Sequence, residues 1–457
     1  MSKSNDLGNG NIGKLLFALA APAIVAQLVN VLYNIVDRIF IGKMVNGELA
    51  MAGVGVAFPI IMLVSAFSAL VGMGGAPLCA IKMGAKDNDG AEEIMSNSFS
   101  MLIIIGVILT IIFLVFREPI LWKFGASEAT IGYSLDYLTI YVIGTIFVQI
   151  ALGMNSYINT QGFAKIGMFT VVIGAIINII LDPIFIFTFG LGVKGAALAT
   201  ITAQFVSALW VLKFLFGKKS ILKIRKRYLI PKAKVVLPTV ALGVSPFIMQ
   251  STESLVLISL NTKLSMYGGD IAVGAMTIMS SIMQIIVMPI QGLAQGAQPI
   301  ISYNYGAKQM KRVKQTFKLT LFSCLVFTVA MTGLLMLFPQ LFVSIFNNKP
   351  ELMQITTWSI RIYFAGIFIF GAQIACQQTF LALGQAKISL FLALLRKVVL
   401  LVPLIYILPN FFDDKLRGVL TAEPIADVLA TLTTITCFIV FYKKKLAYVD
   451  QIDDNVE

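Results

Sequence analysis

Five acidic residues lie inside long apolar stretches of this sequence, where a charge is costly and needs a reason. Two of them, Asp37 and Asp182, are in the first half. Asn178 precedes Asp182 by one helical turn, so the two side chains would share a helix face. Pro183 follows directly, and a proline would free the carbonyl of Ile179 as a further oxygen ligand. Such oxygens suit sodium, a hard cation, and a carboxylate can equally accept a proton.

Each of these acids also has a structural interpretation, which the sequence leaves open. Asp37 could lie near the outer end of its helix, paired with Arg38 or reaching water. Asp182 could merely satisfy the backbone groups that Pro183 frees at a kink. The chain has no histidine, so histidine metal sites and histidine proton relays are excluded. Any proton chemistry would therefore fall to the carboxylates.

The second half places its acids near basic residues. Arg396 and Lys397 interrupt one apolar stretch, and Glu423 and Asp427 lie one turn apart in the next. We expect a structural ion pair between these two helices, in preference to a second ion site. Glu253 is the remaining acid. It could face a cleft and attract cations, or it could be buried, protonated and structural.

The elements that position these residues are membrane-spanning helices. Of the 457 residues, 58% are hydrophobic and only 12% are charged, whereas a typical soluble domain has roughly 25% charged residues. Uncharged stretches such as 49–81 and 271–307 exceed the roughly 20 residues that a helix needs to cross a bilayer. The four cysteines are far apart, which indicates neither a disulfide framework nor a metal cluster. The net charge of +13 lies in loops, where it indicates topology rather than nucleic-acid binding.

The apolar blocks predict an all-α polytopic membrane protein with twelve transmembrane helices. The expected helices cover residues 15–42, 49–80, 94–117, 136–161, 167–190, 195–216, 236–262, 271–300, 316–345, 355–384, 387–410 and 418–442. The first block is too long for the apolar region of a signal peptide, so we expect it to be the first span.

Basic residues set the expected orientation. They gather in the loops 218–234 and 308–318 and in the tail at 443–445, whereas the opposite loops hold little more than Lys43 and Lys194. By the positive-inside rule both termini are cytoplasmic. We interpret the basic loops as a solvated rim facing the membrane, rather than as a surface that binds nucleic acid or a specific lipid.

The two halves of the chain are related by duplication. At an offset of 222 residues, Gly84-Ala85-Lys86 falls on Gly306-Ala307-Lys308 and Pro77 falls on Pro299. Each half has six spans, so the repeats enter the membrane from the same side. The sequence therefore predicts an N-lobe (1–217), a basic cytoplasmic linker (218–235), a C-lobe (236–445) and a cytoplasmic tail (446–457). Two lobes about a central cleft are typical of alternating-access transporters.

The sequence resembles the multidrug and toxic compound extrusion (MATE) family, in the bacterial and archaeal branches that have an asparagine and an aspartate on span five. The matching segments are Pro22, Asp37–Gly42, Gly84–Lys86, Asn178–Pro183, and Gly192 with Gly195–Ala197. They lie mostly in the N-lobe, and the repeat extends the likeness over nearly the whole chain. The resemblance implies a V-shaped, two-lobe antiporter that expels organic cations in exchange for sodium or protons.

The resemblance also implies a cation site in the N-lobe. The family places an acid on span one, an asparagine and an aspartate on span five, and a threonine on span six. Asp37, Asn178, Asp182 and Thr200 match these places, and Asn155 on span four matches a nearby polar member. In the second half the repeat puts Asn261 at the position of Asp37, Leu400 at that of Asn178 and Leu404 at that of Asp182. The C-lobe therefore has no carboxylate copy of the site.

Glu253 resembles the acid that other branches of the family use on span seven. Those branches also use an aspartate on span ten, where this sequence has Gln373, Gln377 and Gln378. This departure argues against a sodium site in the C-lobe. We expect Glu253 and Gln250 to contact substrate, together with Tyr33 and Asn34 of the first span.

We therefore expect a secondary active antiporter that exports lipophilic, mainly cationic drugs or toxins, and not an enzyme. It would need no cofactor beyond Na+ or H+ as coupling ion, and Na+ could bind at Asp37, Asn178, Asp182 and Thr200. We expect a monomer in the plasma membrane of a prokaryote, in contact with the lipid bilayer and with no nucleic-acid partner.

Two other functions are consistent with a chain of this kind. A related two-lobe flippase for lipid-linked precursors would line its cavity with several basic residues, whereas the deep cations here form no single large cluster. They are Arg38, Arg361, Arg396 and Lys397. A membrane-embedded enzyme would need a nucleophile with a base, and no such set is found.

Overall fold

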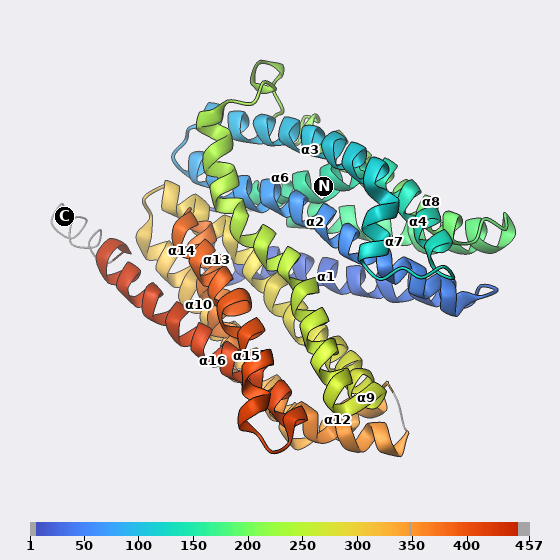
Figure 1. Cartoon of the computed structure of the whole chain (residues 1–457). Helices are drawn as coiled ribbons and strands as arrows, with labels where there is room; N and C mark the ends of the chain where they lie inside the picture. The colour runs from blue at the N-terminus through green and yellow to red at the C-terminus, as the bar shows by residue number, and fades with distance from the viewer. Residues whose placement is uncertain (1–5, 347–348, 447–457) are drawn as a thin grey trace.

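The computed structural model describes residues 6–346 and 349–446, and within them the chain forms two lobes of helices arranged as a V (Figure 1). The first lobe contains α1 (Ile12–Gly42), α2 (Gly47–Gly84), α3 (Asn88–Lys123), α4 (Ile131–Ile143), α5 (Thr145–Val148), η1 (Gln149–Gly153), α6 (Met154–Thr160), α7 (Ala164–Pro183), η2 (Ile184–Thr188) and α8 (Val193–Leu215). A connection with one short helical turn, η3 (Lys226–Tyr228), leads to the second lobe. That lobe contains α9 (Ala233–Gly306), α10 (Met310–Leu337), α11 (Pro339–Ser344), α12 (Pro350–Tyr363), α13 (Ile367–Ala382), α14 (Ala386–Leu394), η4 (Leu395–Leu401), α15 (Val402–Ile407), η5 (Leu408–Phe411), α16 (Lys415–Phe441) and η6 (Tyr442–Leu446).

The helices account for the twelve predicted spans. Among the described residues, nine helices are long and apolar enough to cross a bilayer, and two bent pairs raise the number to eleven. The bent pairs are α4 with α5–α6, at 58°, and α12 with α13, at 51°. α9 is 74 residues long and is broken at Gly269 (φ 63°, ψ −162°), so it supplies two spans rather than one. This makes the chain an all-α, multi-pass membrane protein.

The predicted duplication is present in the backbone as well. Residues 222 positions apart adopt the same unusual conformations in the two halves. The pairs with positive φ are Lys86 (60°) with Lys308 (59°), and Gly162 (82°) with Gly384 (69°). Positive φ is uncommon outside glycine, so the lysine pair is a specific match. Gly144 and Gly366, also 222 apart, lie at the bends of the two broken spans.

The lobes contact each other at one end of the V through close backbone approaches. A Cβ atom added to Gly243 of α9 would lie 1.7 Å from the carbonyl oxygen of Leu70, in α2. Gly84 and Gly306 make a matching pair of contacts, and a Cβ on either would lie 1.9 Å from a carbonyl oxygen of the other lobe. Only glycine permits helices to approach this closely. The other end of each lobe diverges, at the end of α1 and at the break in α9 (Figure 1).

The basic linker is held against the start of α3. The Arg225 guanidinium donates to the Glu92 carboxylate at 2.7 and 3.2 Å, and the Lys223 N–H donates to the same group at 3.0 Å. Asn97 accepts from the Lys232 N–H at 2.6 Å and donates to the Tyr228 carbonyl at 2.9 Å. Buried polar groups of α3 therefore fix this segment to the first lobe, while the side chains of Arg225 and Lys232 remain 50% and 56% exposed. The interpretation of the basic loops as a solvated rim stays a prediction.

Candidate functional site

Four of the five predicted cation-site residues come together in the N-lobe. Asn178 and Asp182 lie one turn apart on α7, and the Asn178 amide donates to Asp182 Oδ1 and to Thr200 Oγ1 of α8, both at 3.3 Å. The Thr200 hydroxyl donates back to the Ala196 carbonyl at 3.0 Å, as helical threonines commonly do. The carboxyl groups of Asp37, from α1, and Asp182 lie within hydrogen-bonding reach of each other.

Three oxygens of this group have no hydrogen-bond donor among the described residues: Asp37 Oδ1, Asn178 Oδ1 and Asp182 Oδ2. Asn178 and Asp182 are almost fully buried, at 1% and 0% exposure. The neighbouring Arg38 is directed over the Phe58 ring, 5.5 Å from its centroid. Two carboxylates that share one buried site cannot both stay ionised without a cation between them. The arrangement can therefore hold a proton or a small hard cation.

Asn155 lies at a different part of the same lobe. Its amide donates to the Gly167 carbonyl at 3.2 Å, and its oxygen accepts from the Thr170 hydroxyl at 3.1 Å. A cavity of about 90 Å³, lined by Asn155, Tyr33, Asn178 and Thr200 among others, connects the two places. This volume is large enough for several water molecules. Asn155 is therefore a lining residue of the cavity rather than a direct partner of the acid pair.

Tyr137 is a site residue that the sequence analysis missed. It lies on α4, is 4% exposed, and its hydroxyl lies within hydrogen-bonding reach of Thr200. Its ring stacks on Tyr141, one turn further along α4, with centroids 6.1 Å apart. The available signal was the pair of tyrosines one turn apart at the start of an uncharged stretch. Nothing in that pattern indicates that the span would turn this face toward Asp37.

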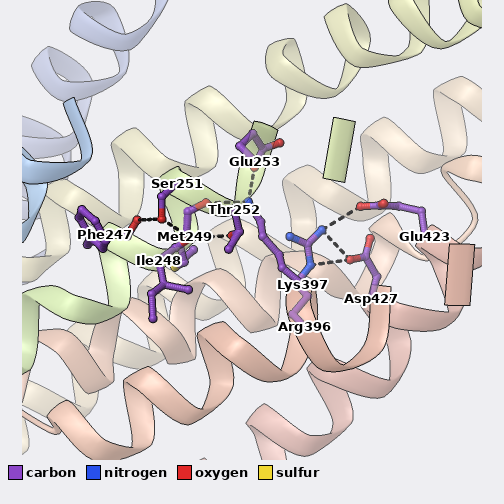
Figure 2. Close-up of polar contacts among 10 residues, drawn as sticks. All are labelled: Phe247, Ile248, Met249, Ser251, Thr252, Glu253, Arg396, Lys397, Glu423 and Asp427. Carbon is purple, nitrogen blue, oxygen red and sulfur yellow. Dashed lines mark hydrogen bonds and ion pairs between the residues drawn. The ribbon is translucent and has the colours of Figure 1, made fainter. Parts of the chain in front are cut away.

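A second polar cluster lies in the C-lobe (Figure 2). Arg396 of η4 donates from Nε to Asp427 Oδ1 at 2.8 Å and from Nη2 to Glu423 Oε1 at 3.0 Å, which confirms the predicted ion pair between these helices. Lys397 does not join that pair. Its ammonium group forms an ion pair with Glu253 of α9 and donates to the Met249 carbonyl at 2.8 Å. Lys397 thus supplies a counter-charge for Glu253, whose side chain is 66% exposed. This argues against a buried, protonated Glu253, and its contact with substrate stays a prediction.

The four predicted substrate residues lie in two separate places. Tyr33 and Asn34 are on α1 in the N-lobe, where Tyr33 lines the cavity and the exposed Asn34 donates to the Asn30 carbonyl at 2.7 Å. Gln250 and Glu253 are on α9 in the C-lobe, where Glu253 is part of the charged cluster. The fold thus assigns these residues to opposite lobes.

Within the described residues, the membrane-spanning helices form two repeated lobes, each with a buried polar cluster, and this is an architecture typical of secondary transporters. The MatE family profile matches this chain twice, over residues 22–184 and 246–407, once in each half. The chain therefore belongs to the MatE family of multidrug efflux transporters, which confirms the resemblance to the family. The assignment to branches with an asparagine and an aspartate on span five stays a prediction. Members of this family are transporters and not enzymes.

Individual relatives agree with this assignment. The multidrug export protein MepA of Staphylococcus haemolyticus is 27% identical over 442 residues, which cover 96% of each chain. A crystal structure of MATE in the bent conformation superposes with a TM-score of 0.90 at 24% identity, covering 98% of this chain and 99% of the other. The outward-facing conformation of a multidrug resistance MATE family transporter gives a TM-score of 0.89, also at 24% identity, covering 98% of this chain and 100% of the other. At this identity the structural likeness shows the fold.

Proposed function

We propose that this chain is a cation-coupled antiporter that exports lipophilic, mainly cationic drugs or toxins in exchange for Na+ or H+. The lobes 1–217 and 236–445 would alternate in access about the central cleft, with residues 218–235 as the linker and 446–457 as the tail. The protein would act as a monomer in the plasma membrane of a prokaryote, with both termini in the cytoplasm. The basic loops support this orientation, in which the closed end of the V would lie at the cytoplasmic side.

One observation carries the proposal: the carboxyl groups of Asp37 and Asp182 lie within hydrogen-bonding reach of each other, and each has a buried oxygen without a donor among the described residues. An ion can drive a conformational change only when it binds the two conformations with different affinity. A carboxyl pair contributed by α1 and α7 meets this condition, because any movement of one helix against the other separates the two oxygens. Binding of a proton or Na+ would then favour the conformation in which the pair is closed.

The expected substrates follow from the charge of the N-lobe site and from the names of related proteins. The N-lobe site carries two acids and no described basic partner, so it attracts positive charge. Relatives such as the S. haemolyticus protein are multidrug exporters by name. An apolar contact between Phe67 and Phe247, with centroids 4.9 Å apart, lies where the two lobes meet and provides an aromatic surface for lipophilic molecules.

Transport in everted membrane vesicles tests the proposal. Uptake of a cationic dye should respond to an imposed Na+ gradient at constant pH, or to a pH gradient without Na+, and the response identifies the coupling ion. Asp37→Asn and Asp182→Asn should each reduce gradient-driven uptake at least tenfold while the protein remains folded in the membrane. The matched control is Asp136→Asn, an N-lobe acid with an exposed partner, Lys194, at 3.4 Å. Full transport by both site variants would contradict the proposal.

A further inference from the structure

The C-lobe cluster contains more acid than base. Glu423 and Asp427 lie one turn apart on α16, and both reach the same guanidinium group, that of Arg396 (Figure 2). Their side chains are 6% and 0% exposed, and that of Arg396 is 13% exposed. Two ionised carboxylates and one guanidinium would leave a net negative charge in the interior of the lobe. An uncompensated buried charge of this kind is strongly unfavourable.

Nearby groups do not supply the missing positive charge. The titratable or charged groups that face the pair are Arg396 and Lys397 of η4, Glu253 of α9 and Tyr363 of α12. Lys397 is already paired with Glu253, and Tyr363 is neutral and buried, at 4% exposure. The cluster as a whole therefore has three acids and two bases. Among the described residues, one carboxylate of the cluster lacks a counter-charge.

The unpaired charge can be located at two atoms. Glu423 Oε2 and Asp427 Oδ2 are both buried and have no hydrogen-bond partner among the described residues. Each carboxylate thus uses one oxygen to accept from Arg396 and leaves the other unsatisfied. A buried acceptor without a donor costs free energy. A proton on one of these oxygens would remove one unsatisfied acceptor and also the surplus charge.

We propose that Glu423 and Asp427 form a proton-binding site of the C-lobe, separate from the N-lobe pair, and that Glu423 carries the proton. Arg396 distinguishes the two acids. Asp427 Oδ1 accepts from Nε of Arg396 at 2.8 Å and also lies 2.8 Å from Nη2, whereas Glu423 Oε1 accepts from Nη2 at 3.0 Å. The carboxylate that lies closer to the guanidinium nitrogens keeps its negative charge, so the proton resides on the other acid.

The surroundings of the pair favour a proton over a metal cation. A cation bound between the two carboxylates would lie beside the Arg396 guanidinium, which already approaches both of them within 3.0 Å and would repel it. The Phe370 ring covers Arg396, with the guanidinium carbon 4.6 Å from the ring centroid, and adds no oxygen ligand. The nearby oxygen of Gln373 accepts from the Thr431 hydroxyl at 3.4 Å. A proton needs no coordination shell and fits this confined site.

Infrared spectroscopy of the purified full chain tests the site without depending on transport. The background is Asp37→Asn with Asp182→Asn, which removes the N-lobe acids. At neutral pH this protein should retain the C=O stretch of a neutral carboxylic acid. Adding Glu423→Gln should remove that band. Asp427→Asn should also remove it, because Glu423 then becomes the only carboxylate that pairs with Arg396 and must ionise.

The matched control is Glu351→Gln, an exposed acid in the same lobe, which should leave the band unchanged. The band lost on Glu423→Gln should shift when the protein is labelled with 13C-glutamate. Glu423→Gln should unfold at the same temperature as its parent, because glutamine has the shape of the protonated acid. The proposal is wrong if neither Glu423→Gln nor Asp427→Asn alters the band in folded protein, since both acids would then be ionised. A shift with 13C-aspartate instead would overturn the assignment to Glu423.

Discussion

At the residue scale, Thr200 connects the parts of the N-lobe site. Its hydroxyl oxygen accepts from Asn178, which also donates to Asp182, and the Tyr137 hydroxyl lies within hydrogen-bonding reach of it. Three helices, α4, α7 and α8, thus contribute to one network that holds Asp182 opposite Asp37. Hydrogen bonds of this kind orient the side chains that bind an ion. Substitutions of the residues that form them therefore test the site as well as substitutions of the acids do.

Thr200→Val should weaken coupling while leaving the fold intact. Valine has the same shape but lacks the hydroxyl, so Asn178 and Tyr137 each lose a partner. A loss of about 1.4 kcal/mol corresponds to a roughly tenfold lower apparent affinity for the coupling ion. The measurement is the ion dependence of dye uptake in vesicles. Thr202→Val is the matched control, because the Thr202 hydroxyl only donates to the Leu198 carbonyl of its own helix, at 2.7 Å. Equal effects of the two variants would show that Thr200 has only a local role.

Tyr137→Phe tests the residue that was found only in the structure. The change removes one hydroxyl from a buried network, and we expect an approximately fivefold weaker apparent ion affinity, from the loss of about 1 kcal/mol. Tyr141→Phe removes a hydroxyl from the neighbouring buried ring and should have little effect, because Tyr141 contacts the site only through ring stacking. Vesicle uptake at graded ion concentrations compares the two. A normal ion affinity in Tyr137→Phe would exclude the hydroxyl from the site.

The sequence could predict Asp37, Asn178 and Asp182 because polar residues in an apolar span stand out individually. It could not predict Tyr137, which is amphipathic and common in such spans, or the pairing of Lys397 with Glu253. Lys397 and Arg396 are adjacent in sequence, yet the π-helical turn η4 places one toward α9 and the other toward α16. Which of two neighbouring cations meets which acid depends on helix rotation, and the sequence pattern does not determine that rotation.

At the scale of elements, the linker is fixed through one buried acid. Glu92 of α3 is 5% exposed and accepts from Arg225 and from the backbone of Lys223. Asp89, one turn earlier, pairs with Arg227 at 2.6 Å, but both side chains are largely exposed. The two ion pairs join the same helix to the same linker and differ mainly in burial, which makes them a matched comparison.

Glu92→Gln should lower the thermal stability of the purified protein, whereas Asp89→Asn should not change it measurably. The buried carboxylate loses charge-assisted bonds that we expect to contribute about 1–2 kcal/mol, discounted because Arg225 is half exposed. The exposed pair contributes at most about 0.5 kcal/mol. The measurement is the unfolding midpoint in detergent, with added salt as a second variable. If the two variants behave alike, the linker is not anchored by Glu92.

Most elements follow from the sequence because charge clusters separate the apolar blocks. The bends in the fourth and tenth spans do not, since neither block has a charged residue at its bend and each was predicted as one continuous helix. The bends occur near Gly144 and Gly366, where the chain packs closely against other helices. A Cβ on Gly144 would lie 2.4 Å from Ile201, and one on Gly366 would lie 2.8 Å from the Pro424 backbone. Tertiary packing therefore sets these bends, and local propensity alone does not indicate them.

At the scale of the whole molecule, glycine contacts between α2 and α9 hold one end of the V together. Gly74 packs against Thr239 and Gly243, and Gly243 packs against Leu70, so the two backbones are in direct contact. Since backbone atoms cannot move aside as side chains do, a single added methyl group must separate the helices. The two lobes would then separate at this end. Under the proposed alternating access, this interface would be the point about which the lobes exchange their open and closed ends.

Gly243→Ala should shift the protein toward the conformation in which this end is open and the opposite end is closed. The added Cβ would lie 1.7 Å from the Leu70 carbonyl oxygen, a distance that the closed interface cannot accommodate. Spin labels at Val45 (90% exposed) and Met266 (68% exposed), near the diverging ends of the two lobes, report the change in a cysteine-free background. Their distance distribution should gain a shorter component. Gly333→Ala is the control, because nothing lies within 4 Å of its added Cβ, and it should leave the distances unchanged.

Gly74→Ala, whose Cβ would lie 2.2 Å from the Thr239 carbonyl oxygen, should repeat the shift from the other helix. Unaltered distances in both folded variants would mean that the glycine contacts do not control the balance between the two conformations.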